Sequence, residues 1–567
     1  MQKVISIGKQ NFVSLRENDC FYIDKTDLIC KWWESKDEIT LITRPRRFGK
    51  TLNMSMLNCF FSNQFTGRED LFKGLAVWKK EKYRKMQGTY PVIFLNFSAI
   101  KGSNYEDARD GIIMAINEAY SEHRYLLESN ELTDGERKCF EELDYYAKNP
   151  GIKKQVANDT ICNAVKNLAN CLSRYYKKKV ILLDEYDTPM QEAYLYGYWK
   201  EFTAFIRSLF NATFKTNPYL ERAMMTGITR VSKESVFSGL NNLNVVTTTS
   251  TEYETCFGFS EEEVFQALEE RGMNNQKKLV KSWYDGFVFG NTHDIYNPWS
   301  ITNFLDKKQV RPYWADTSSN SMIDELIRKA STDIKEKMEE LLQGKEIVVN
   351  FDEQIVFEQL DQDENAIWSL MLVSGYLKAE QIEYRGVLLE PWYHLRITNL
   401  ETTAMFTTMF KGWFAKNQSN YNQFMKALLS DDIDAMNYYM NQIIMTTFSY
   451  FDVGQNEPER FYHGFVLGLI ADQTDIYEIR SNRESGFGRY DVMMIPKIKE
   501  TKKYPAIIME FKVRNIKREE SLEDTVQTAL TQIKEKCYDA ELYDRGLKKE
   551  EIHHYGFAFE GKKVLIG

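Results

Sequence analysis

The chain has 567 residues, of which 43% are hydrophobic and 27% charged, and its formal net charge is -9. This length exceeds one ordinary domain, and the composition is that of a folded globular protein, which excludes a disordered chain. The negative charge argues against a protein that coats nucleic acid over its whole surface, although it leaves room for a local basic groove.

Neither a membrane span nor a disulfide framework is predicted. The most apolar runs fall far short of the ~20 residues that cross a bilayer, and the amino terminus lacks the pattern of a signal peptide. The eight cysteines are widely spaced, without a close pair at metal-ligand spacing. We therefore expect a soluble, cytoplasmic protein that does not contact a membrane.

Short apolar runs alternate with helical stretches in the first part of the chain. This alternation is typical of a parallel sheet covered by helices, so residues 1–260 are predicted to form an α/β domain. The charged segment 102–170 is helical in pattern and is interpreted as an insertion. The apolar runs that predict strands are 39–43, 92–97, 180–183, 223–226 and 245–249.

Residues 261–450 are predicted to form a mostly helical middle or linker domain. It starts with a helix over 261–270, capped by Ser260, and includes a buried helix over 368–377. No motif in this region indicates a chemistry. Residues 451–567 then give a helix, three strands, a helix and a strand, which predicts an antiparallel meander with helices packed on it.

A phosphate-binding loop is predicted where the strand 39–43 ends. Gly49, Lys50 and Thr51 match the decisive end of such a loop, although Arg44 replaces its usual first glycine. Backbone amides at a helix start hold phosphate oxygens, the lysine meets the outer phosphates, and the threonine hydroxyl binds magnesium. We expect ATP and Mg²⁺ to bind here.

An acidic pair supports this interpretation. The apolar strand 180–183 ends in Asp184 and Glu185. Asp184 would hold magnesium together with Thr51, and Glu185 would polarise the attacking water. The alternative is an ordinary helix start with solvated loop acids. Within the loop, Arg46, Arg47 and Phe48 are assigned to nucleotide binding, with a solvated face weighed equally for the two arginines.

A second group of charged side chains lies on two predicted strands near the carboxyl terminus. Asp491 belongs to the strand 489–495, while Glu510 and Lys512 share one face of the strand 506–513. Two carboxylates bind magnesium, and a lysine can orient the water that attacks a phosphodiester. The alternative is a surface pairing of an acid with a lysine, which is common in strands.

The chain resembles the bacterial AAA-ATPase-like proteins that are typically joined to a carboxyl-terminal PD-(D/E)XK nuclease-like domain. In that family the phosphate loop commonly carries arginine and proline where this chain has Arg44 and Pro45. The segments that carry the resemblance are 22–26, 44–51, 183–189, 227–243 and 283–290, then 462–464, 480–490, Gln532 and Tyr538.

The resemblance implies further site residues. Thr226 would sense the terminal phosphate of ATP, and Arg230 would stabilise its charge. In the nuclease-like domain, Glu484 looks like a matching acidic position and would add a third metal ligand, while Gln532 would support the site. A histidine near a helix start is more often structural than catalytic, so His463 is a weak candidate for a catalytic residue.

The leading hypothesis is an ATPase that governs a magnesium-dependent nuclease-like domain, with DNA favoured over RNA as the substrate. The second hypothesis is a nucleotide-controlled switch or scaffold whose terminal domain binds without cutting. The third hypothesis is a protein-remodelling ATPase. The sequence leaves open whether the chain forms a homo-oligomer.

Overall fold

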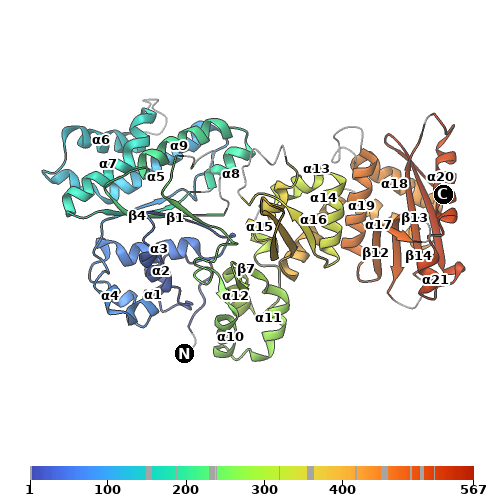
Figure 1. Cartoon of the computed structure of the whole chain (residues 1–567), viewed down its shortest axis with the longest axis horizontal. Helices are drawn as coiled ribbons and strands as arrows, with labels where there is room; N and C mark the ends of the chain where they lie inside the picture. The colour runs from blue at the N-terminus through green and yellow to red at the C-terminus, as the bar shows by residue number, and fades with distance from the viewer. Residues whose placement is uncertain are drawn as a thin grey trace. The chain divides into compact units, whose positions relative to one another are not determined.

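The computed structural model describes residues 3–148, 156–186, 188–228, 237, 239–317, 320–353, 363–415, 418–447, 457–485, 488–497, 504–515 and 517–567 (Figure 1). The chain folds into two compact units. The first unit comprises residues 1–317 and 348–401, and the second comprises residues 318–347 and 402–567. The predicted boundaries at residues 260 and 450 stay predictions.

A parallel five-stranded sheet lies at the centre of the first unit, in the order β2-β3-β4-β1-β5. Every residue of β1 is buried, as expected for a strand covered on both faces. The strands are β1 (Ile39–Thr43), β2 (Val92–Asn96), β3 (Val180–Glu185), β4 (Leu220–Gly227) and β5 (Leu243–Val246). All five overlap the predicted ranges, although β5 starts two residues and ends three residues earlier than predicted, and the α/β fold class is confirmed.

Helices cover both faces of this sheet, with α1–α4 on one side and α5–α9 on the other (Figure 1). The first group is α1 (Phe12–Glu17), α2 (Asp27–Ser35), α3 (Lys50–Phe61) and α4 (Glu81–Arg84). The second group is α5 (Tyr105–Glu122), α6 (Asp134–Lys148), α7 (Asn158–Tyr176), α8 (Thr188–Leu195) and α9 (Trp199–Phe214). The predicted insertion 102–170 therefore contains α5, α6 and most of α7.

The first unit continues into a small antiparallel sheet with three helices. The helix α10 has the predicted bounds, and its start is fixed by a capping box of Ser260 and Glu263. The elements are β6 (Phe259–Ser260), α10 (Glu261–Glu270), α11 (Lys277–Tyr284), β7 (Phe287–Phe289), β8 (Thr292–Tyr296) and α12 (Pro298–Lys307), with the strand order β6-β8-β7.

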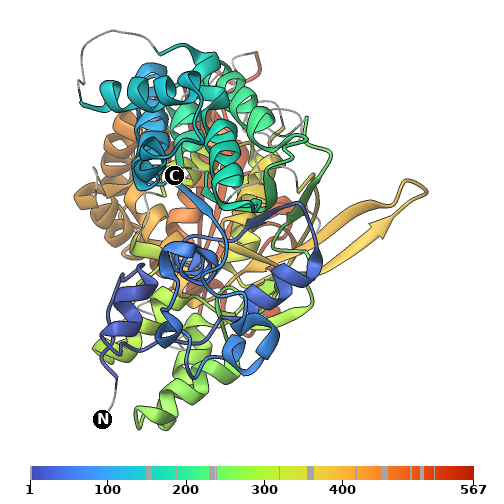
Figure 2. The same cartoon turned by 90° about the vertical axis from the view of Figure 1, so that its left-hand side faces the viewer.

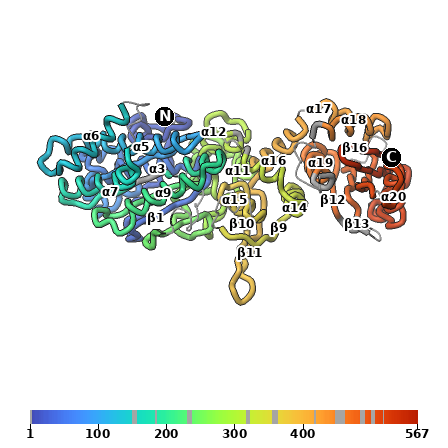
Figure 3. The backbone as a smooth tube through the Cα atoms, turned by 90° about the horizontal axis from the view of Figure 1, so that it is seen from above, coloured from blue at the N-terminus to red at the C-terminus, as the bar shows by residue number. Residues whose placement is uncertain are grey.

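A long hairpin of strands β10 (Leu377–Arg385) and β11 (Glu390–Ile397) stands out from the first unit (Figures 2 and 3). It belongs to the sheet β10-β11-β9, in which β9 spans Ile347–Asn350. The helix before it, α15 (Ala366–Val373), ends earlier than predicted, since Gly375 adopts φ +85° and a strand follows. The hairpin itself was not predicted.

A mixed five-stranded sheet forms the core of the second unit, in the order β12-β13-β14-β15-β16. Neighbouring strands are antiparallel except β14 and β15, which run parallel. The strands are β12 (Tyr477–Ser485), β13 (Gly488–Pro496), β14 (Ala506–Val513), β15 (Ile552–Glu560) and β16 (Lys563–Ile566). The predicted meander is confirmed, and β16 is an additional strand.

The single helix predicted after this meander is two helices in the structure. α20 (Leu522–Glu535) ends before Cys537, which has φ +53°, and α21 (Ala540–Asp544) follows. The other helices of this unit are α13 (Ser321–Lys329), α14 (Thr332–Leu342), α16 (Leu400–Trp413), which begins in the first unit, α17 (Gln418–Leu429), α18 (Ile433–Thr447) and α19 (Glu457–Gln473). Within the described ranges, no helix has the length and apolarity to span a bilayer.

Candidate nucleotide-binding and nuclease sites

The predicted phosphate loop leaves β1 and ends at the start of α3. Arg47 and Gly49 have positive φ angles of 64° and 80°. A Cβ atom on Gly49 would meet nothing within 4 Å, so the backbone conformation, not the space, favours glycine here. Turns of this kind form concave anion sites from their amides, and here the turn leads into the amino terminus of a 12-residue helix.

The lysine of the loop lies over the loop's own backbone. The Lys50 ammonium donates hydrogen bonds to the carbonyl oxygens of Arg44 at 2.8 Å and Pro45 at 3.0 Å. Thr51 is the second residue of α3 and is half-buried. The lysine and the helix start therefore face the same short turn.

Arg44, at the position of the missing glycine, is completely buried. Its guanidinium donates to the carbonyl oxygens of Thr43 at 2.8 Å and Thr247 at 2.6 Å, and lies 4.6 Å from the ring of Phe289. Burial lowers the pKa of Arg44 to about 10, which still leaves it charged at neutral pH. The side chain thus ties the loop to the end of β5.

Residues far along the chain hold the middle of the loop. The Arg46 carbonyl accepts hydrogen bonds from the side chains of Asn297 at 3.2 Å and Trp314 at 3.1 Å. The backbone amide of Trp314 in turn donates to Glu401 at 2.6 Å, and Glu401 is fully buried. No local pattern in the sequence indicates these partners, so the sequence analysis missed them.

Aromatic contacts also hold the phosphate loop in place. The buried Phe48 ring packs edge-on against Phe287 and Phe289, with centroids 4.8 and 5.3 Å away. At Gly375 a Cβ atom would come within 2.9 Å of both Phe287 and Pro45, so only glycine permits this close approach. Phe48 therefore anchors the loop in the core.

The two predicted loop arginines have protein partners. Arg46 donates to the side-chain oxygen of Gln191 at 3.1 Å, and the exposed Arg47 lies 4.3 Å from the ring of Trp299. Their assignment to nucleotide binding stays a prediction.

The acidic strand lies one strand away from the loop strand. In the sheet, β4 separates β3 from β1, and Thr226 is paired with Ile42 on one side and Glu185 on the other. The backbones of Asp184 and Glu185 form the carboxyl end of β3, whereas their side chains and all of Arg230 lie outside the described residues. The Thr226 hydroxyl is buried, and no described group hydrogen-bonds to it.

In the second unit, the three predicted nuclease residues come together on β13 and β14. The backbone amide of Phe511 donates to the Asp491 carboxylate at 2.7 Å. The Lys512 ammonium lies 3.7 Å from the Glu510 carboxylate. The two carboxylates and the lysine thus occupy one region of adjacent strands.

The electrostatics of Glu510 fit a cation. Glu510 is only 3% exposed. Its burial, and to a smaller extent the charge of Asp491, raises its pKa to about 8. One of its carboxylate oxygens, Oε2, is buried without a hydrogen-bond partner among the described groups. Oxygen ligands of this kind suit magnesium, which would also favour the ionised carboxylate.

Gln532 on α20 connects Glu510 to Lys512. Its amide nitrogen donates to Glu510 and, at 2.9 Å, to the hydroxyl of Tyr538. Its amide oxygen accepts from Lys512 at 2.7 Å. The supporting position predicted for Gln532 therefore coincides with direct contacts, whereas the side chain of Glu484 on β12 lies outside the described residues.

His463 is buried behind this site against an acid from α14. Its Nδ1 lies 3.1 Å from Glu339, which also accepts a hydrogen bond from Ser481. Burial raises the pKa of Glu339, and His463 opposes that effect. The adjacent Tyr462 donates to the backbone carbonyl of Asp491 at 2.6 Å. These contacts give His463 a structural role beside the site.

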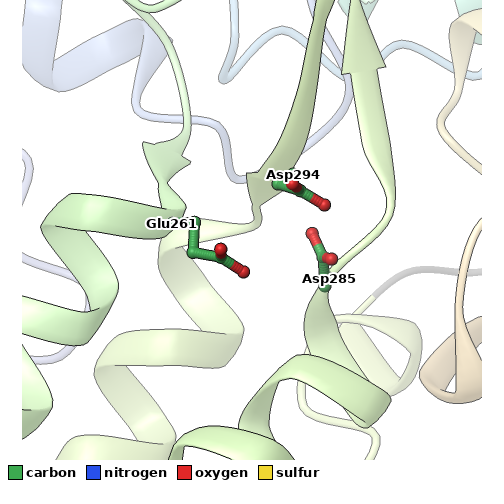
Figure 4. Close-up of side chains that lie close together, drawn as sticks. All are labelled: Glu261, Asp285 and Asp294. Atoms are coloured by element: carbon green, nitrogen blue, oxygen red, sulfur yellow. The ribbon is translucent and has the colours of Figure 1, made fainter.

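Another acidic cluster lies in the first unit, where Glu261, Asp285 and Asp294 converge (Figure 4). Lys281 pairs with Glu261 and lies 3.8 Å from Asp285 and 3.5 Å from Asp294. This lysine supplies the counter-charge, so the cluster is explained as an ion-pair network that fixes α10, α11 and β8 together.

We expect Asp285→Asn to stabilise the protein at high pH. Burial and Asp294 raise the pKa of Asp285 from 3.8 to about 7, so the folded protein holds this proton more tightly than the unfolded chain. Stability is then lost as the pH rises from about 4 to 7. The substitution should add about 1 kcal/mol at pH 8 and little at pH 4, measured by urea unfolding. Glu262→Gln, an exposed neighbour, should leave the pH profile unchanged.

The comparisons with known proteins match both regions that contain these sites. Residues 6–237 match the AAA-ATPase-like family, described as a predicted AAA-ATPase, and residues 457–567 match a family of the PD-(D/E)XK nuclease superfamily. A protein of Azotobacter chroococcum mcd 1, called an uncharacterized protein in the vnfD 5' region, is 25% identical over 579 residues, which cover 98% of this chain and 96% of that one.

Two solved structures also match, each at low similarity. A Walker-type ATPase of Pyrococcus abyssi superposes with a TM-score of 0.35 at 11% identity, covering 69% of this chain and 96% of that one. The ORC2 protein of Aeropyrum pernix gives a TM-score of 0.27 at 9% identity, covering 67% and 90%. By its family matches, the chain joins an AAA-ATPase-like domain to a domain of the PD-(D/E)XK nuclease superfamily.

Proposed function

We propose that this protein binds and hydrolyses ATP in its first domain and thereby governs a magnesium-dependent nuclease that acts on nucleic acid, with DNA favoured over RNA. The observation that carries the proposal is the meeting of Asp491, Glu510 and Lys512 on adjacent strands. A buried acid such as Glu510 is costly unless a cation or proton compensates it. A structural surface pair would have no such burial.

At the nuclease site, Asp491 and Glu510 would hold magnesium, and Glu484 would be a third ligand. Bound magnesium supplies charge stabilisation for the phosphodiester oxygens and a lowered pKa for its water. The Lys512 ammonium orients the attacking water and stabilises the developing negative charge. Gln532 holds Lys512 and Glu510 at their places in the site.

At the ATP site, Lys50 and the amides of Gly49 bind the phosphates, and Thr51 with Asp184 would hold magnesium. Glu185 would orient the attacking water. Thr226, whose buried hydroxyl lies at the end of β4 between the loop strand and the acidic strand, would donate to the terminal phosphate. Arg230 would neutralise charge on that phosphate. We place this ATPase in the cytoplasm, away from membranes.

The second candidate is a nucleotide-controlled switch or scaffold whose terminal domain binds nucleic acid or protein without cutting it. The hydrogen bonds of Gln532 to both Glu510 and Lys512 would support it, because a side-chain network of this kind can also be structural. A remodelling ATPase without a nucleic-acid role is the third.

One experiment separates these candidates. Purified protein is incubated with magnesium, ATP and single- or double-stranded DNA, beside the variants Lys50→Ala and Glu510→Ala. We expect Glu510→Ala to abolish cutting and spare ATP turnover, and Lys50→Ala to abolish ATP turnover. Equal cutting by the intact protein and Glu510→Ala would remove the nuclease proposal, binding without cutting would favour the switch, and no nucleic-acid binding would favour remodelling.

A further inference from the structure

The tip of the β10–β11 hairpin exposes three aliphatic side chains in a row. Val387, Leu388 and Leu389 are 100%, 83% and 65% exposed. Leu389 also has φ +53°, a left-handed conformation that glycine or asparagine would adopt at lower cost. The sequence thus accepts both an exposed apolar surface and a strained turn, which is typical of a contact surface.

The outer side of this hairpin is an open sheet edge. In the order β10-β11-β9, strand β10 has a neighbour on one side only among the described strands. Gln381, Tyr384 and Arg385 are exposed along it. An edge strand of this length is a template for pairing with another strand.

The charges of β10 restrict the partner. Glu383 and Arg385 lie two residues apart and therefore on the same face, where they bond at 2.7 Å. Nearer the base, Lys378 pairs with Glu380 at 2.8 Å. Positive and negative groups thus balance along the strand, which favours a protein partner over nucleic acid or an anionic membrane.

A cavity of about 280 Å³ opens at the base of the same hairpin. Its wall includes the aliphatic side chains of Val288, Leu372, Ala379 and Ile382. Polar residues, among them Thr248, His293 and Gln381, share this wall, so the recess has a mixed lining. The hairpin thus carries a projection at its tip and a recess at its base, and together with the balanced charges of β10 these allow the self-complementary contact that a two-fold symmetric interface requires.

We propose that two copies of this chain pair the outer ends of their β10 edges antiparallel, with the two-fold axis at Tyr384, so that residues 383–385 of the two copies lie opposite one another. This register sets Arg385 of each copy directly opposite Glu383 of the other, so two ion pairs form across the axis. It also carries the tip residues Val387 to Leu389 over the partner's residues 379–381, beside the recess. The interface is independent of ATP turnover and of nucleic-acid cleavage.

Charge reversal tests the register in the full-length protein. Intact protein should be a dimer by light scattering on a sizing column. Glu383→Arg sets arginine opposite arginine, and Arg385→Glu sets glutamate opposite glutamate. Each variant should therefore weaken self-association by about tenfold or more. A mixture of the two variants should restore dimers, because every opposed pair is then of opposite charge.

The mixing step excludes a trivial loss of the hairpin, since two misfolded variants would not recover affinity for each other. A second readout is oxidation of Tyr384→Cys in a Cys537→Ser background, which removes the only exposed cysteine among the eight. The two-fold axis predicts a rapid cross-link at position 384, but none with Tyr438→Cys, an exposed site elsewhere. Intact protein that stays monomeric, or single variants that dimerise as well as the mixture, would overturn the proposal.

Discussion

Arg44→Gly, which restores the glycine usual at the first position of a phosphate loop, is expected to destabilise the protein and to abolish ATP turnover. The substitution removes the donors for the carbonyl oxygens of Thr43 and Thr247 and leaves a void beside Phe289. The loss of two buried hydrogen bonds to these carbonyls and the core cavity together cost about 3–5 kcal/mol. Urea unfolding and an ATPase assay on the same preparation measure both effects.

Arg47→Gly is the matched control, three residues further along the same loop. Arg47 is exposed and has φ +64°, a conformation that glycine adopts freely. Its loss removes the contact with Trp299 but relieves the backbone, so the free energy of unfolding should change by less than about 1 kcal/mol. If Arg44→Gly keeps both its stability and its ATPase activity, the buried arginine does not hold the loop.

Glu510→Gln is expected to reduce nucleic-acid cleavage by about a thousandfold, because charge stabilisation worth several kcal/mol is lost with the metal ligand. The amide has nearly the shape of the carboxylate, so the fold should persist. The pKa of the Glu510 carboxyl is raised to about 8, so at pH 9 the folded protein holds a buried carboxylate. The substitution removes that buried charge, so the thermal stability at pH 9 should rise or stay equal.

The pairing of lost activity with kept stability is the decisive feature of this prediction. Glu523→Gln, an exposed acid in the first turn of α20, serves as the control and should cut at the rate of the intact protein. Cleavage by Glu510→Gln within a factor of about three of the intact rate would assign Glu510 to a structural network with Gln532 and Lys512.

The sequence predicted those parts of the fold in which one residue pattern persists over a whole element. The strand Ile39–Thr43 is apolar at most positions because helices cover both its faces, and its prediction matches β1. The strand β10 of the long hairpin was not predicted. Its charged and apolar residues do alternate, but the alternation changes phase at Gln381, where the pairing with β11 is irregular, and most of its residues are partly or fully exposed.

The candidate sites show the same difference between residues with a local sequence pattern and residues without one. Glu510 and Lys512 could be placed on one face because their spacing within a strand decides it. The hydrogen bonds of Asn297 and Trp314 to the Arg46 carbonyl join positions more than two hundred residues apart. Such contacts depend on tertiary packing, which has no local signal in a single sequence.

The alternation of the two units along the chain limits how the protein can be dissected. Each unit is made of two stretches separated by a stretch of the other, so the polypeptide crosses between them three times. One proteolytic nick at a crossing therefore frees neither unit intact. A fragment of residues 457–567 would lack α14 and with it Glu339, which leaves the buried His463 without its acid. A shortened nuclease domain should accordingly include residues 318–347, either fused to it or added as a separate peptide.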